Sequence, residues 1–161
     1  MNRNMMVMGL KGLVILFGVM VLVFFFVFVP QLGREMALAA PEYAWAFWPC
    51  LIFAWVFMLP IVAAAFPAWQ IFDSLREKGR AFCRENAHRF HLIGHFSTAA
   101  AVIFLAGILL LAAKGAGSAP LMFLIMPLVV LAGCAFAFAC HVMGKLVEES
   151  ADMKEENELT I

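Results

Sequence analysis

Four long stretches of this chain contain no charged residue, and this feature constrains its fold more than any other. No Asp, Glu, Lys or Arg occurs in residues 12–33, 43–72, 90–113 or 115–144. An α-helix needs about 20 apolar residues to cross the hydrocarbon core of a bilayer. We therefore predict an all-α integral membrane four-helix bundle with spans near residues 10–31, 44–72, 91–113 and 120–147.

The composition supports a membrane protein and excludes two other classes. The chain is 65% hydrophobic and only 14% charged, whereas soluble domains carry about 25% charged residues. Disordered chains need low hydrophobicity, and a domain of this size cannot bury so much apolar surface in water. We predict one membrane domain over residues 1–161, whose first helix is retained rather than cleaved as a signal peptide.

The basic residues predict the orientation of the spans. Nine of the eleven Lys and Arg residues lie before span one, between spans two and three, or after span four. Only Arg34 and Lys114 lie on the other side. Because basic loops remain in the cytoplasm, we predict that both termini and the middle loop are cytoplasmic.

Prolines and small residues predict how the helices bend and pack. Pro60 and Pro67 in span two and Pro127 in span four are expected to kink their helices. Small residues mark faces where membrane helices approach closely. The expected contact positions are Gly9, Gly12, Ala63–Ala65, Ala99–Ala101, Gly133 and Ala137.

Histidines are the only candidates for site chemistry within or near the spans. His88, His91 and His95 share one helical face, and His95 and His141 lie about a turn inside the same membrane surface. One hypothesis is a metal or haem site formed by His95 and His141. The simpler interpretation is that the imidazoles bond backbone carbonyls or each other. Titration of His91 and His95 as a pH sensor is a further alternative.

The loop and the tail on the predicted cytoplasmic side have opposite charges. Span two is expected to continue to Lys78 and to end at Gly79, and a new helix is expected to start near Cys83. The predicted membrane-surface residues are Arg76, Lys78, Arg80, Arg84 and Arg89. The acidic tail, residues 148–161, is expected to be a charged helix that is solvated or binds a partner. Its predicted partner-binding residues are Glu148, Glu149, Asp152, Glu155, Glu156, Glu158, Leu159 and Ile161.

Two segments carry a resemblance to a known family. The loop sequence GRAFCREN at residues 79–86, followed by Phe90 and Ile93-Gly94, and the closing sequence EENELTI at residues 155–161 resemble the domain-of-unknown-function 2975 family. This resemblance implies a small four-helix protein of the bacterial cytoplasmic (inner) membrane. It also implies a neighbouring gene for a small Cro/CI-like helix-turn-helix regulator, because members are often encoded beside one. Cys83 departs from the Ser or Thr that is usual in the family.

The sequence favours a binding role over catalysis. It contains no nucleophile with a base and an orienting group, no phosphate loop and no paired carboxylates within the spans. We predict a non-enzymatic membrane partner or regulator of a cytoplasmic helix-turn-helix transcription factor, in contact with membrane lipids, without direct nucleic-acid binding and without a cofactor. The alternatives are a haem- or metal-binding protein that uses His95 and His141, and a binder of hydrophobic small molecules or lipids.

Overall fold

The chain folds into helices joined end to end, as expected for a backbone that must satisfy its own polar groups in lipid. The structure, a computed structural model, describes residues 3–76, 82–114 and 120–159, with side chains described for residues 5–76, 82–114 and 126–157. The elements are α1 (Arg3–Val23), the π-helical turn η1 (Phe24–Phe28), α2 (Val29–Ala39), the 3-10 helix η2 (Pro41–Ala46), α3 (Phe47–Ser74), α4 (Arg84–Ala113) and α5 (Pro120–Leu159).

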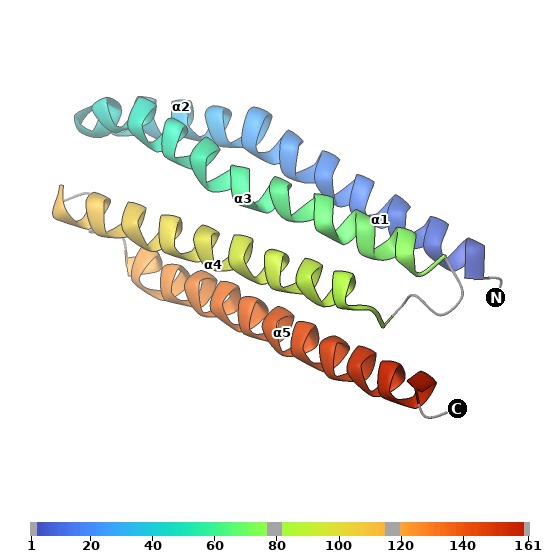
Figure 1. Cartoon of the computed structure of the whole chain (residues 1–161). Coiled ribbons are helices and arrows are strands. Elements are labelled where there is room, and N and C mark those ends of the chain that lie inside the picture. The colour runs from blue at the N-terminus through green and yellow to red at the C-terminus, as the bar shows by residue number, and fades with distance from the viewer. Residues whose placement is uncertain (1–2, 77–81, 115–119, 160–161) are drawn as a thin grey trace.

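The four predicted spans are confirmed as four helical segments long and apolar enough to cross a membrane within the described residues. Span one consists of α1, η1 and α2 together, and span two consists of η2 and α3. Span three is α4 and span four is α5. The start of α1, the end of α3, the start of α4 and the end of α5 lie at one end of the bundle (Figure 1), which we call the terminal end. The other end, where α2 turns into α3, is the opposite end.

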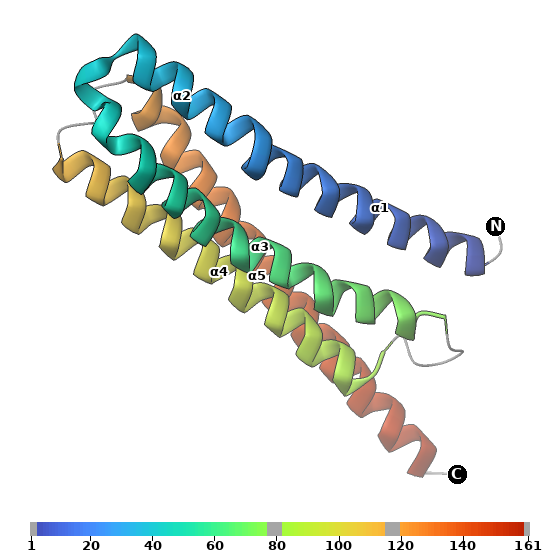
Figure 2. The same ribbon diagram turned by 90° about the horizontal axis from the view of Figure 1, so that it is seen from above.

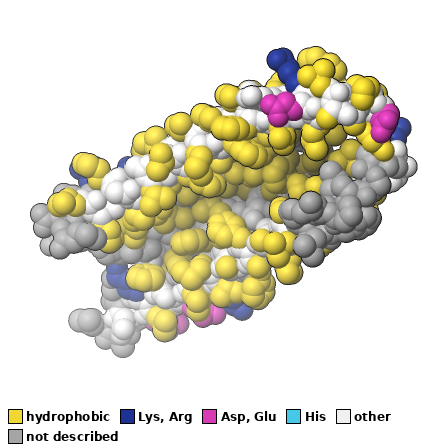
Figure 3. Space-filling view, turned by 180° about the vertical axis from the view of Figure 1, so that it is seen from behind, with side chains coloured by type: hydrophobic (Ala, Val, Ile, Leu, Met, Phe, Trp, Pro, Cys, Tyr) yellow, Lys and Arg dark blue, Asp and Glu magenta, His cyan; other side chains and the backbone are white. Residues whose placement is uncertain are grey.

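The spans are arranged in a row rather than in a closed square. The most extensive interface is between α4 and α5, and the next is between α3 and α4. Among the described residues, span one packs only against η2 and α3, and Figure 2 shows α1 well apart from α5. Seen from behind, the row encloses a hollow lined with hydrophobic side chains (Figure 3).

The α4–α5 interface follows a heptad-like pattern of small residues. The buried residues of α4 include Ala87, Gly94 and Ala101, each seven positions after the last, and they lie against Gly144, His141 and Gly133 of α5. Such spacing keeps one seam of a helix facing its partner. The predicted contact at Gly133 is confirmed, because a Cβ added there would lie 3.4 Å from the Cβ of Ala101.

The expected contact at Gly9 and Gly12 is wrong for the single chain. A Cβ added at either position would meet no atom within 4 Å. The reason is that α3 is the only other span against which α1 packs in the described part of the chain, so most of the circumference of α1 faces away from the protein. The expected end of span two is also wrong, because α3 ends at Ser74 rather than at Lys78. The positions of Lys78 and Gly79 lie outside the described residues. The expected start near Cys83 is confirmed, since α4 begins at Arg84.

The helices continue through three of the prolines, Pro60, Pro67 and Pro127. Pro30 differs, because it follows a turn of π-helix that the sequence does not predict. At the end of η1 the N–H of Val29 donates to the carbonyl of Phe24, five residues back. Pro30 has no N–H with which to reach the next carbonyl, that of Phe25. The indole Nε1 of Trp55 on α3 donates to this oxygen at 3.4 Å, and its ring stacks on Phe26. Trp55 thus joins span one to α3 at the point where the proline interrupts the backbone ladder.

Replacing Trp55 with phenylalanine is expected to lower the free energy of unfolding by about 1 kcal/mol, a usual contribution for a hydrogen bond between membrane helices. The measurement is an SDS unfolding titration of the detergent-solubilised protein followed by circular dichroism. Trp48→Phe is the matched control, because Trp48 lies on the same helix and is 65% exposed. Equal stability of the two variants would contradict a role for the indole donor.

Candidate functional site

Polar side chains from α3 and α4 form a hydrogen-bonded network at the terminal end. Asn86 is fully buried, with 0% of its surface exposed. Its Nδ2 donates to the hydroxyl of Ser74 at 2.5 Å, and this hydroxyl donates to the carbonyl of Ile71 at 2.6 Å. The network therefore fixes the last turn of α3 against the first turn of α4, across residues 77–81.

Arg89 extends this network and joins the two helices a second time. Its Nη1 donates to Asn86 Oδ1 at 2.7 Å, and its Nε donates to Gln70 Oε1 at 3.1 Å. Its Nη2 also lies 3.8 Å from a carboxylate oxygen of Glu85. Only 21% of the Arg89 side chain is exposed, so most of its donors serve protein oxygens.

The acidic tail is a helical extension of α5 that contacts the start of α4. Arg84 donates from Nε to Asp152 Oδ1 at 3.0 Å, and its Nη2 lies 2.9 Å from the same oxygen. The same Nη2 lies 3.7 Å from Glu155 Oε2. The side chains of Arg84 and Glu155 are largely exposed, and that of Asp152 is half-buried. One arginine of the basic loop thus holds one face of the acidic helix.

The other predicted partner-binding residues are distributed around this contact. Glu148, Glu149, Glu155 and Glu156 are exposed on α5, and Asp152 is half-buried. Glu158, Leu159 and Ile161 have side chains outside the described residues. Partner binding by this set stays a prediction.

The predicted membrane-surface residues have different surroundings. Arg76 and Arg84 are exposed, but Arg84 pairs with the tail and Arg89 is turned into the Asn86 network. Lys78 and Arg80 lie outside the described residues. Nearby, Lys11 on α1 pairs with Asp73 and lies 4.6 Å from the ring centre of Trp69 on α3. The terminal end therefore combines basic groups from α1, from α4 and from the turn after α3 with acidic groups from α3 and α5.

Three histidine rings lie together between α4 and α5. The ring centres of His95 and His141 are 5.0 Å apart, and those of His91 and His141 are 5.4 Å apart. His95 and His141 had been expected at the same depth; the structure adds His91. Gly94 and Gly144 make room for this cluster, because a Cβ at Gly94 would lie 2.3 Å from His141 Nδ1 and one at Gly144 2.9 Å from His91. His88 is exposed on the same helix.

The hydrogen bonds of the histidines define their tautomers. The Nδ1 of His95 lies 2.6 Å from the His91 carbonyl, and the Nδ1 of His141 lies 2.8 Å from the Ala137 carbonyl. A carbonyl oxygen can only accept, so each neutral ring carries its proton on Nδ1 and its lone pair on Nε2. Within the described part of the chain, no three His, Cys, Asp or Glu side chains are arranged to hold a metal ion. Metal binding by His95 and His141 stays an untested prediction.

The Asn86 network is a site that was not predicted from the sequence. A signal was available, because Asn86 precedes Ile93 and Ala100 by seven and fourteen residues on one seam of α4. A polar residue at the end of an otherwise apolar or small-residue seam predicts a buried, hydrogen-bonded group. No corresponding signal in the sequence identified Ser74 as the partner of Asn86 or Gln70 as the partner of Arg89, because both partners belong to a different helix.

Comparison with known proteins gives two matches to this chain. A family model described as "Protein of unknown function (DUF2975)" matches residues 31–161. The chain is also 26% identical over 163 residues to a protein of Bacillus subtilis (strain 168) described as "Uncharacterized membrane protein YoaS", and the match covers 100% of both chains. No solved structure matches. The match to the family model begins within α2, after the π-helical turn of span one.

Proposed function

We propose that this chain, which belongs to the DUF2975 family of proteins of unknown function, is a non-enzymatic membrane protein that binds a small cytoplasmic helix-turn-helix regulator at its terminal end. In this proposal the protein resides in the bacterial inner membrane with both termini in the cytoplasm. The acidic helix at the end of α5 is the contact surface, and the regulator supplies a basic surface.

The observation that carries this proposal is the arrangement of acidic groups along the end of α5. Asp152 and Glu155 face Arg84, so the helix is held beside α4 by one face. Glu148 and Glu149 are exposed before this contact. Carboxylates that are already held on a helix lose less conformational entropy on binding than those of a disordered tail, and this favours association.

The charge of this helix suits a DNA-binding partner. A helix-turn-helix protein places a basic surface against DNA phosphates. Carboxylates on a membrane-bound helix attract the same surface and compete with phosphate for it. Binding would therefore hold the regulator at the membrane and away from its operator, and would weaken as the salt concentration rises.

The test is co-purification of the full-length protein with the helix-turn-helix regulator encoded beside it. The combined variant Glu148→Gln and Glu149→Gln removes two exposed carboxylates and keeps the Arg84 contact. We expect it to retain at least fivefold less regulator than the unaltered chain at low salt, because each lost charge weakens attraction to a basic surface. Deletion of residues 148–161 is expected to abolish retention.

The matched control removes two carboxylates from the opposite end of the bundle. Glu35→Gln and Glu42→Gln change the net charge equally and are exposed near the α2–α3 turn. Retention should be unchanged in this control. Equal loss in both variants would indicate a nonspecific charge effect, and absence of the regulator from the unaltered protein would overturn the proposal. The proposal includes no bound cofactor, so haem absorption or stoichiometric metal in the purified protein would favour the alternative at His95 and His141.

A further inference from the structure

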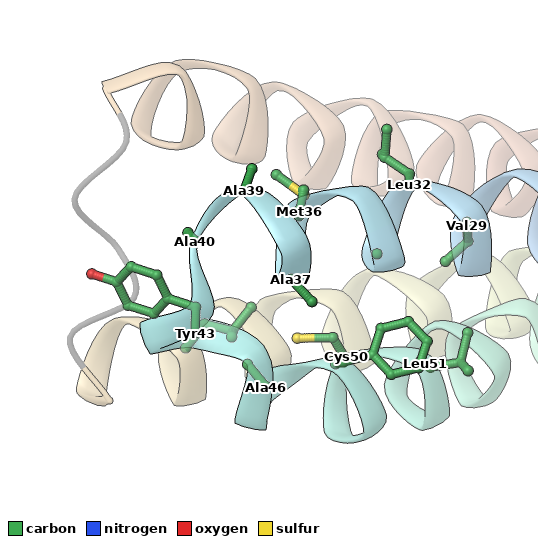
Figure 4. Close-up of a pocket in the computed structure, with 13 residues that line it drawn as sticks. Val29, Leu32, Met36, Ala37, Ala39, Ala40, Tyr43, Ala46, Cys50 and Leu51 are labelled. Carbon is green, nitrogen blue, oxygen red and sulfur yellow. The ribbon is translucent and has the colours of Figure 1, made fainter.

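A cavity of about 530 Å³ lies between α2 and α3 at the opposite end of the bundle (Figure 4). Leu32, Met36 and Ala37 line it from α2, and Phe47, Cys50 and Leu51 line it from α3. Leu111 contributes from α4. Small-molecule sites have volumes of about 300–1,000 Å³, so the cavity has the size of a ligand site.

The helices around the cavity separate where small residues face each other. At Gly33 span one is close to α3, because a Cβ there would lie 3.0 Å from Cε2 of Phe47. One turn further on, Ala37 follows on α2, and Ala40 comes directly after the end of this helix. Ala46 and Cys50 line the cavity from the other side. Small residues usually permit close contact between membrane helices. Here they leave space instead, and the larger side chains of Leu32 and Phe47 line the same space.

The lining chemistry specifies an uncharged occupant. Among the described lining residues the polar side-chain groups are the Tyr43 hydroxyl and the Cys50 thiol, and Figure 4 shows the hydroxyl directed away from the space. The charged residues of this end, Arg34, Glu35, Glu42 and Lys114, are exposed, do not line the cavity, and their charges cancel. Nothing in the lining would bind a phosphate or a carboxylate.

From these observations we infer that the cavity binds an uncharged, largely apolar small molecule that enters from the bilayer. This inference is independent of the regulator at the terminal end. The ligand would wedge between span one and α3, and its affinity would come from burial of apolar surface and close contact with Met36, Phe47 and Leu51. A phospholipid chain is the competing occupant that the experiment must distinguish.

The test is photolabelling of the full-length protein in phosphatidylcholine vesicles with a neutral alkylphenyl diazirine, followed by mapping of the adducts by mass spectrometry. We expect adducts on Cys50 and on Leu51, which is only 6% exposed, that saturate with probe concentration and fall at least fivefold with excess unlabelled alkylbenzene. Leu38, which is 82% exposed on the same helix, reports labelling from bulk lipid. Its adducts should rise in proportion to the probe and resist competition.

Two variants and one further measurement make the outcome decisive. Ala37→Leu fills the cavity and should remove the saturable adducts, whereas Ala106→Leu, at an exposed position of α4, should not. Adducts on Cys50 and Leu51 that rise without saturation, as at Leu38, would overturn the inference. So would native mass spectrometry showing one retained phospholipid per chain that excludes the probe. Competition in the unaltered chain decides the question even if Ala37→Leu does not fold.

Discussion

Asn86→Ala is expected to lower the free energy of unfolding by about 2–3 kcal/mol, because it removes a buried amide that serves two helices. The Nδ2 donor to Ser74 and the Oδ1 acceptor from Arg89 disappear together. The Arg89 guanidinium then remains mostly buried and has lost one of its hydrogen-bond acceptors. An SDS unfolding titration of the solubilised protein, followed by circular dichroism, measures the loss.

The matched control for Asn86 is the same substitution at Asn157, which is exposed near the end of α5. Asn157→Ala should change the stability by less than about 0.5 kcal/mol, as is usual for surface positions. If the two variants unfold at the same SDS fraction, the network does not hold α3 to α4. Asn86→Asp keeps an acceptor for Arg89 and loses the donor to Ser74, so it should fall between the unaltered chain and Asn86→Ala.

Gly94→Ala is expected to destabilise the α4–α5 pair by about 1–3 kcal/mol, the usual cost of adding a methyl group to a closely packed site. The new Cβ would lie 2.3 Å from His141 Nδ1 and 3.2 Å from the carbonyl of Ala137. His141 cannot simply turn aside, because its Nδ1 is bonded to that carbonyl at 2.8 Å. The helices must therefore separate or the hydrogen bond must break.

Gly18→Ala is the control for Gly94, because a Cβ at Gly18 would meet no atom within 4 Å. This variant should be neutral or stabilising, since alanine favours a helix over glycine by up to about 1 kcal/mol. His141→Ala in the Gly94→Ala background should recover part of the lost stability if the ring is the obstacle. No recovery in the same SDS titration would place the strain elsewhere.

The positions of the spans could be predicted from sequence because lipid excludes charged groups along a whole helix. The start of α4 at Arg84 could also be predicted to within one residue, although the first turns of this helix are still charged and polar. The end of α3 could not, because it depends on the Ser74–Asn86 bond between two helices. The π-helical turn before Pro30 depends in the same way on a donor from Trp55.

The depth of the candidate site residues along the spans could be predicted from the sequence, but the direction in which their side chains point could not. Antiparallel spans place His95 and His141 at one level, and the structure brings their rings together. Whether His91 joins them depends on how α4 is rotated about its own axis. The glycines that face the rings set this rotation. The cavity could not be predicted at all, because Ala37 and Cys50 resemble residues of a closed contact until their helices are placed.

Within the described residues, span one is attached to the rest of the protein only through η2 and α3, and this has a consequence for how the protein responds to its bilayer. On every other side, α1 exchanges protein contacts for lipid contacts, and lipid is as apolar as the helix itself. Burial of apolar surface therefore does not drive span one onto α3. A narrow set of contacts must do so, with Lys11 of α1 at one end and the bond from Trp55 to Phe25 of η1 near the middle. Bilayer thickness, which sets helix tilt, acts directly on this seam. Span one is accordingly the part of the protein whose position lipid composition should alter first.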